Sequence, residues 1–335
     1  MDYINNPNLN LTTVSRDCFT EDIQVDQSSS NKQHFIEANT IETTLEELKS
    51  DHIIPVYIKD NETLISQAEF IESTIEIARE HYGPGNVLEP ILRVSHPMKG
   101  RVPEARNKSA MDLLEHEKTL YYERLAFIIE VPSIKGFVGG NELSLTIGGV
   151  KSYSYDNFYG KKGTDEHFKI FIGFKNTVCT NMCVWSDGFV SDLKVKSLAH
   201  LRTHIRSMIQ NYNSDMHLEA LIKFTNYNLS ERQFATIIGK CRMYHHLPLE
   251  LKKKTPTLLL GDTQISAVCR AFYRDSNFAS SKTGEISLWN LYNLFTGANK
   301  SSYIDSFLDR AENSFSLLSH IQSGLENKTT SWYLT

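Results

Sequence analysis

The run from Thr296 to Asp305 carries groups that could bind a phosphate. Ser302 and Asp305 have the spacing of an N-terminal helix cap, and Lys300 lies just before them. Backbone N–H groups at a helix start attract anions, and a lysine nearby strengthens the attraction. Gly297 can close the preceding helix in the left-handed conformation, so the run predicts a helix end, a turn and a helix start. The predicted anion site comprises Asn299, Lys300, Ser301 and Ser302.

This run does not match a nucleotide-binding P-loop. A P-loop needs a glycine directly before the lysine so that successive N–H groups face the phosphates, and here Asn299 occupies that position. ATP hydrolysis is therefore disfavoured. The partners left open for Lys300 are a single phosphate or a backbone carbonyl.

A second candidate is the basic stretch between Arg93 and Lys108, with five Lys/Arg, one histidine and one acid. Pro97, Gly100 and Pro103 interrupt it, so it cannot be a continuous helix. A loop of this composition suits contacts with nucleic-acid phosphates, while a solvated connection between packed elements is the alternative. The residues expected to contact nucleic acid are Arg93, His96, Lys99, Arg101, Arg106 and Lys108.

Four more basic residues follow beyond residue 190. Lys194 and Lys196 precede a predicted helix, in which Arg202 and Arg206 share one flank of the apolar face. These charges would extend a nucleic-acid track, and an ordinary solvent-facing surface is the alternative.

Two pairs of potential metal ligands are weak candidates for a metal site. His200 and His204 lie four residues apart on that helix but lack the glutamate of the His-Glu-x-x-His pattern. Cys179 and Cys183 are separated by three residues rather than two, and with Cys241 they follow apolar strand and helix patterns. We therefore expect these cysteines to be buried thiols, and we expect no metal or other cofactor.

Composition gives little information about a partner. The chain of 335 residues has a net charge of −5, and residues 1–50 hold nine Asp/Glu against three Lys/Arg. The five cysteines lack the dense spacing of a secreted disulfide scaffold, and no stretch reaches the roughly 18 apolar residues of a membrane helix. We expect a cytoplasmic protein with no membrane partner; the sequence does not indicate its oligomeric state.

The N-terminal part of the chain is predicted to contain a polar arm followed by the first helix of the folded domain. The polar, acidic segment 1–50 predicts a mobile arm. Ser66 and Glu69 form a capping box that opens a helix reaching Gly83. Order is therefore expected to begin near residue 50, with a single domain over 51–335.

A mainly antiparallel sheet is predicted from about 125 to 190. Alternating apolar residues mark its strands, and Gly139–Gly140 supplies a hairpin turn. From about 190 the apolar period becomes helical, with a capping box at Ser230 and Gln233 and a last helix over 303–323. The fold class is therefore α+β, with the sheet packed by N-terminal and C-terminal helices.

Several longer segments carry a resemblance to a known family. They are Arg93–Pro97, Lys99–Arg101, Glu117–Arg124, Leu145–Lys151, Phe171–Asn176, Val178–Asn181 and Leu291–Lys300. Together they resemble a bacterial family known only as a domain of unknown function, numbered 3871, from about residue 50 to 335. Gly148–Val150 and Val178–Asn181 resemble, more faintly, a phage- and plasmid-associated family numbered 932. Such families occur on mobile elements, which implies DNA or replication and recombination proteins as partners, but no established catalytic residues.

The combined features favour a non-enzymatic nucleic-acid-binding protein of a bacterial mobile element, with DNA favoured over RNA as the ligand. The alternative is an interaction or assembly protein that binds a partner through a sheet edge or the last helix. An enzyme with an unrecognised phosphate-linked site ranks third, because no sequence pattern pairs a nucleophile with a base.

Overall fold

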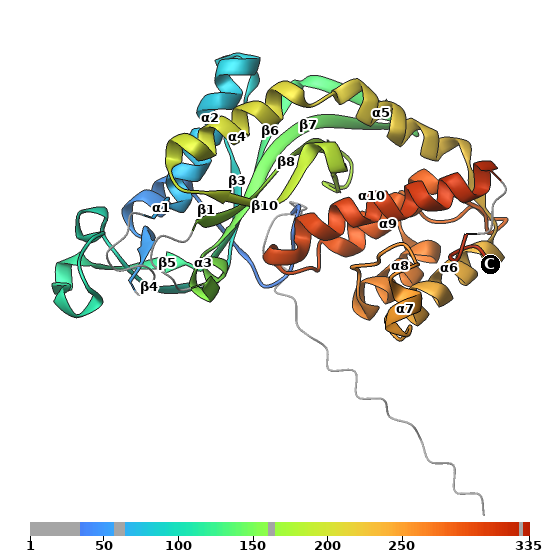
Figure 1. Ribbon diagram of the computed structural model, residues 1–335. Helices are drawn as coiled ribbons and strands as arrows, with labels where there is room; N and C mark the ends of the chain where they lie inside the picture. Colours follow the sequence, from blue (N-terminus) through green and yellow to red (C-terminus); the bar gives the residue numbers. More distant parts are fainter. Residues whose placement is uncertain (1–33, 57–63, 160–164, 328–330) are drawn as a thin grey trace, which may run out of the picture. The chain divides into compact units, whose positions relative to one another are not determined.

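Seven antiparallel strands form the main sheet of the computed structural model (Figure 1). The structure describes residues 34–56, 64–159, 165–327 and 331–335. The strands lie in the order β1-β3-β6-β7-β8-β10, with β9 paired to β8. Their bounds are Ile41–Thr43 (β1), Ile91–Val94 (β3), Arg124–Val138 (β6), Asn141–Ser152 (β7), Glu166–Asn176 (β8), Met182–Cys183 (β9) and Phe189–Val195 (β10). The predicted antiparallel sheet and α+β class are confirmed.

The long hairpin of β6 and β7 depends on glycine at two places. Gly139 and Gly140 form its turn with φ angles of 55° and 81°, the region that a tight hairpin turn requires. Within β7, a Cβ at Gly149 would lie 2.5 Å from the ring of Phe70. The absent side chain therefore lets this aromatic ring pack directly on the sheet.

Helices cover both faces of the sheet. On one face lie α2 (Gln67–Tyr82) and α4 (Leu198–Asn211), which also contact each other (Figure 1). Phe70 of α2 meets the rings of Phe127 and Phe168 edge-on, each at 4.9 Å between centroids. The opposite face packs against the beginning of α10 (Ile304–Asn327).

The C-terminal part is mainly helical, as predicted. Its helices before α10 are α5 (Ser214–Lys223), α6 (Glu231–Tyr244), α7 (Leu249–Lys252), α8 (Asp262–Arg274) and α9 (Leu288–Asn299). A short ribbon of β11 (Asn228–Leu229) and β12 (Ile286–Ser287) joins two of the connections. The predicted capping boxes are both present, at Ser66 with Glu69 and at Ser230 with Gln233.

Two predictions of local structure are wrong. The basic stretch 93–108 is not a loop throughout, because its first residues end β3 and residues Pro97–Arg101 form β4. Strand β4 pairs with β2 (Ile54–Pro55) and β5 (Lys118–Tyr122) in a small second sheet. The change to helix also comes later than predicted, since β10 occupies residues 189–195. At the end of β10 exposed charged residues alternate with buried apolar ones, which suits a strand with one covered face.

The ordered part begins before residue 50. Phe35 and Ile36 are 3% and 0% exposed and pack against the start of α10, where Phe35 and Phe307 form an edge-on ring pair. Strand β1 and helix α1 (Leu45–Ser50) follow. A few apolar residues thus dock a segment whose average composition is polar. Residues 1–33 of the predicted arm lie outside the described residues.

Across the described ranges, no helix is both long and apolar enough to cross a membrane.

Candidate functional site

Arg93, predicted to contact phosphate, is instead buried and hydrogen-bonded to Thr40. Its side chain lies on β3 and the residue is 6% exposed. The Nε atom donates to Thr40 Oγ1 at 3.0 Å, and a terminal nitrogen donates to the Thr40 carbonyl at 2.6 Å. Burial lowers the pKa of this guanidinium. Arg93 therefore anchors the segment before β1 and is not presented to a phosphate.

Three further residues of the basic stretch bond within the protein. Arg101 is 1% exposed and donates to the Lys108 carbonyl at 2.5 Å. Arg106 donates to Glu69 at 3.3 Å, and the Lys108 ammonium donates to Glu117. Of the six predicted residues, only His96 and Lys99 are exposed. The stretch is thus a folded ion-pair network rather than an open basic loop.

The arginines of α4 are also paired. Arg202 donates to Glu76 and Arg206 to Glu80, each at 2.6 Å, so both connect α4 to α2. Lys194 lies 3.3 Å from Asp192, and Lys196 is exposed. The predicted track therefore retains few charges that are not already balanced by carboxylates.

The predicted anion site around Lys300 is filled by the protein itself. Helix α9 runs through Gly297 to Asn299, so Gly297 does not close it, and Lys300 follows in right-handed conformation. Lys300 is 7% exposed, and its ammonium donates to the Cys179 carbonyl and to Thr180 Oγ1. Burial lowers the pKa of Lys300. Of the two partners left open by the sequence, the structure places a backbone carbonyl at this ammonium.

The other residues of that site bond across the junction between α9 and α10. Ser302 donates to Asn299 Oδ1 and accepts from Arg310, both at 2.8 Å. Because α10 begins at Ile304, Ser302 does not cap it. Asn299 donates to the Phe307 carbonyl at 2.9 Å, and Ser301 donates to the carbonyl of Ala298 at 2.8 Å. The predicted anion site is therefore a structural junction.

A buried asparagine cluster brings three segments of the family resemblance together. Asn176 donates to Asn293 Oδ1 at 3.1 Å, and Asn181 donates to the Asn293 carbonyl at 2.9 Å. Thr180, with φ of 55°, takes a conformation rare for threonine in the loop between β8 and β9. Lys300 holds this loop from the end of α9. The hydrogen bonds of Asn176, Asn181 and Lys300 explain how α9 docks on the sheet.

The cysteine predictions are confirmed for two of three residues. Cys183 and Cys241 are both 0% exposed, and burial raises the pKa of Cys241 to about 12. Cys179 is half-buried rather than buried, and burial raises its pKa to about 11. The pKa of each of the three thiols is raised above its usual value, with burial as the largest cause.

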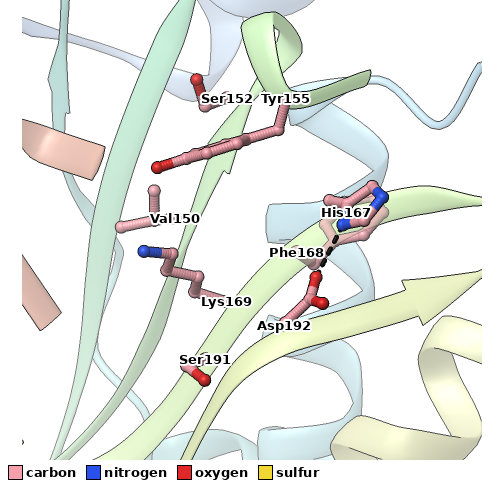
Figure 2. A pocket seen from close by; sticks show the side chains of 8 residues that line it. All are labelled: Val150, Ser152, Tyr155, His167, Phe168, Lys169, Ser191 and Asp192. Carbon is pink, nitrogen blue, oxygen red and sulfur yellow. Dashed lines mark hydrogen bonds and ion pairs between the residues drawn. The ribbon is translucent and has the colours of Figure 1, made fainter. Parts of the chain in front are cut away.

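A small pocket, which sequence reasoning missed, lies beside β10 (Figure 2). It measures about 190 Å³ and is lined by Val150, Ser152, Tyr155, His167, Phe168, Lys169, Ser191 and Asp192. The pairing of β8 with β10 shifts register between Val190 and Leu193, which places Ser191 and Asp192 in a bulge. Bulges redirect side chains, so they often occur beside binding sites.

The charged groups of this pocket are paired. His167 Nδ1 lies 2.6 Å from Asp192 Oδ1, and the Lys169 ammonium donates to Asp309 of α10. Partial burial raises the pKa of Asp192, but hydrogen bonds from His167 and Lys194 outweigh it and lower the pKa below its usual value. Ser152 is hydrogen-bonded to Ser154 at 2.8 Å. This arrangement provides a polar recess without an evident activated nucleophile.

The largest run of unbalanced charge lies on the C-terminal helices. Residues 231–274 hold eight Lys/Arg against three Asp/Glu, a formal balance of +5 in a chain of net charge −5. We call the following residues the basic helical surface: Arg232, Arg242, Lys253, Lys254, Arg270 and Arg274. All six are exposed. Within the described part of the chain, no carboxylate forms an ion pair with Arg232, Lys254, Arg270 or Arg274.

The exposed faces of α6 and α8 adjoin. Arg242 of α6 donates to Ser266 of α8 at 2.9 Å, and Tyr273 of α8 donates to Glu231 at the start of α6. The two helices are thus antiparallel neighbours, and α7 lies beside them (Figure 1). Their apolar residues point inward, for example through stacked Phe234 and Phe272. A count of charge along the sequence in a window of about 40 residues would have found this surface.

The family comparison agrees with the resemblance and extends it. The model of a family described as "Domain of unknown function, B. Theta Gene description (DUF3871)" matches residues 18–334. The match therefore includes part of the N-terminal segment that the resemblance left out. The fainter resemblance to the family numbered 932 is not confirmed. No curated protein matches the chain, and no solved structure matches it.

Proposed function

We propose that this chain, which belongs to the DUF3871 family of unknown function, is a non-enzymatic nucleic-acid-binding protein that contacts phosphates through the basic helical surface. The observation that carries this proposal is a set of exposed residues without carboxylate partners among the described residues, namely arginines of α6 and α8 and Lys254 after α7. A phosphate backbone supplies the missing negative charge, and its counterions are released when the contacts form.

Charge pairing supports this surface over the two stretches singled out from the sequence. Arg202 and Arg206 each have a glutamate at 2.6 Å, so a phosphate would have to displace a carboxylate to reach them. Arg232 and Arg270 carry no such competitor among the described residues, and both are exposed, so a phosphate can reach them without displacing a carboxylate. His96 and Lys99, which are exposed, are proposed as outlying contacts.

The proposed ligand, compartment and partners are those expected from the sequence. The ligand is DNA in preference to RNA, the compartment is the cytoplasm, and replication or recombination proteins of a mobile element are the accompanying partners. Backbone contacts alone carry no sequence preference, so the protein is proposed to bind without strong dependence on base sequence.

The alternative of a protein-interaction factor has less support from the surface. The apolar stripe of α10 is already covered, with Phe307, Leu308 and Leu318 all buried. The edge strand β10 carries a bulge and the exposed charges Asp192 and Lys194, features that discourage addition of another strand.

The location of the binding surface is tested by two charge-matched triple variants. Arg232→Gln, Arg270→Gln and Arg274→Gln together remove three unpaired charges. Arg79→Gln, Arg202→Gln and Arg206→Gln together remove three charges that are ion-paired. Fluorescence anisotropy with labelled duplex and single-stranded DNA measures the affinity of each.

We expect the first variant to bind about tenfold or more weakly than the parent, and the second to change affinity by less than about threefold. Equal losses in both variants would show that only net charge matters. A larger loss in the second variant would move the site to α4. Absence of binding by the parent at low salt would remove the proposal.

A further inference from the structure

The histidine pair His200 and His204 lies on α4, away from the basic helical surface and from the charge pairs of that helix. The residues are one helical turn apart, His200 is exposed and His204 is half-buried, and their Nε2 atoms lie 3.0 Å apart. Their ring centroids are 4.6 Å apart with planes inclined by 56°. The two imidazole nitrogens therefore face each other at the surface of α4.

We propose that His200 and His204 form an exchangeable binding site for a divalent transition-metal ion, with Cu²⁺ or Ni²⁺ preferred over Zn²⁺. Imidazole nitrogens are ordinary ligands of all three ions. The helix supplies both donors in advance, because neighbours at this spacing project from the same face. Binding then requires only that the metal replace the contact between the two rings.

The separation of the nitrogens indicates the preferred geometry. With metal–nitrogen bonds of about 2.0–2.1 Å, donors 3.0 Å apart subtend an angle of about 91–97° at the metal. That angle suits the tetragonal or square-planar coordination of Cu²⁺ and Ni²⁺. A tetrahedral Zn²⁺ site would need the nitrogens about 3.3 Å apart. Cu²⁺ also has the highest affinity in the general order for first-row ions.

The site would be open rather than closed. In the ranges that the structure covers, no group of three or more His, Cys, Asp or Glu residues is placed to hold a metal. Water or a donor from another molecule would complete the coordination, so the ion exchanges readily. The site therefore differs from the closed cysteine site that the sequence made improbable, and it does not depend on nucleic-acid binding.

Titration of the full-length protein with CuCl₂ tests the site directly. Calorimetry measures stoichiometry and affinity, and electron paramagnetic resonance of the loaded protein reports coordinated nitrogens. His200→Gln and His204→Gln each remove one donor. The matched control is His246→Gln, because His246 is exposed and has arginine and glutamate, not histidine, four residues away on either side.

We expect the parent to bind one Cu²⁺ with a signal from two imidazole nitrogens. Each single variant at α4 should bind at least about tenfold more weakly with one such nitrogen lost, while His246→Gln binds like the parent. Unchanged affinity and unchanged nitrogen signal in both His200→Gln and His204→Gln would overturn the proposal. Circular dichroism of each variant checks that the fold is intact.

Discussion

Single buried polar side chains hold distant parts of this chain together. Lys300 bonds to the Cys179 carbonyl, 121 residues away in the sequence. Lys151 is 0% exposed and lies 2.6 Å from Asp156 and 2.9 Å from Glu166, below the ring of Phe168. Charges buried in this way need their partners, since an uncompensated one is costly to keep out of water. Their roles are therefore structural in the first place.

Substitution of Lys300 separates a structural from a ligand-binding role. Lys300→Met leaves the Cys179 carbonyl without its donor, so the free energy of unfolding should fall by about 1–3 kcal/mol. Urea denaturation measures this loss, and Lys223→Met serves as the control on an exposed lysine. DNA affinity should not change. A variant that keeps parental stability but loses DNA affinity would restore the anion site first predicted for Lys300.

His217 should make the protein sensitive to acid. The residue is 0% exposed, bonds to the Tyr212 hydroxyl at 2.6 Å, and burial lowers its pKa to about 3. In the unfolded chain a histidine takes a proton near pH 6.5. Between these values the unfolded state holds more protons, so stability is present above pH 6.5 and is lost as the pH falls toward 3.

The size of the acid effect follows from the same shift. His217 should contribute about 2 kcal/mol to the loss of unfolding free energy between pH 7 and pH 5. His217→Gln cannot take a proton, so its loss over this interval should be smaller by that amount. Urea denaturation at the two pH values gives the comparison. Parallel losses in parent and variant would contradict a neutral, buried His217.

At the scale of elements, helices and turns that depend on neighbouring residues are predictable from the sequence. Side chains that bond to residues far along the chain are not. The helix at Ser66 and the hairpin at Gly139–Gly140 depend on residues within a few positions, so the sequence was sufficient. Arg93 bonds to Thr40, 53 residues away, and such a partner leaves no local signal. Local composition therefore predicts a surface for the basic stretch. The basic helical surface was missed because its charges are spread among apolar residues at helical spacing.

The docking of the segment around Phe35 can be tested by substitution. Phe35 is 3% exposed against Phe307 and the sheet, so Phe35→Ala should lower the free energy of unfolding by about 3–5 kcal/mol. Glu37→Ala, an exposed change two residues away, should cost less than about 1 kcal/mol. Chemical denaturation of both full-length variants measures the two free energies of unfolding. Equal stability of Phe35→Ala and the parent would mean that this segment is not docked.

Over the molecule as a whole, charge is distributed unevenly. Carboxylates neutralise Arg202 and Arg206 on α4, whereas residues 231–274 carry a formal balance of +5. Four of the six charges lie on α6 and α8, which pack together through Phe234 and Phe272, so the backbone positions that carry these four charges are fixed before any ligand arrives. A rigid arrangement of this kind favours contact with a repeating charged backbone over contact with a single small anion.

The salt dependence of DNA binding tests the central claim most directly. If about four phosphates are contacted, the logarithm of the association constant should fall with the logarithm of salt concentration with a slope of about −3.6. The triple variant Arg232→Gln, Arg270→Gln and Arg274→Gln should be shallower by about 2.7, because each lost contact removes about 0.9 from the slope. A slope near zero in the parent, or the same slope in parent and variant, would contradict phosphate recognition by this surface.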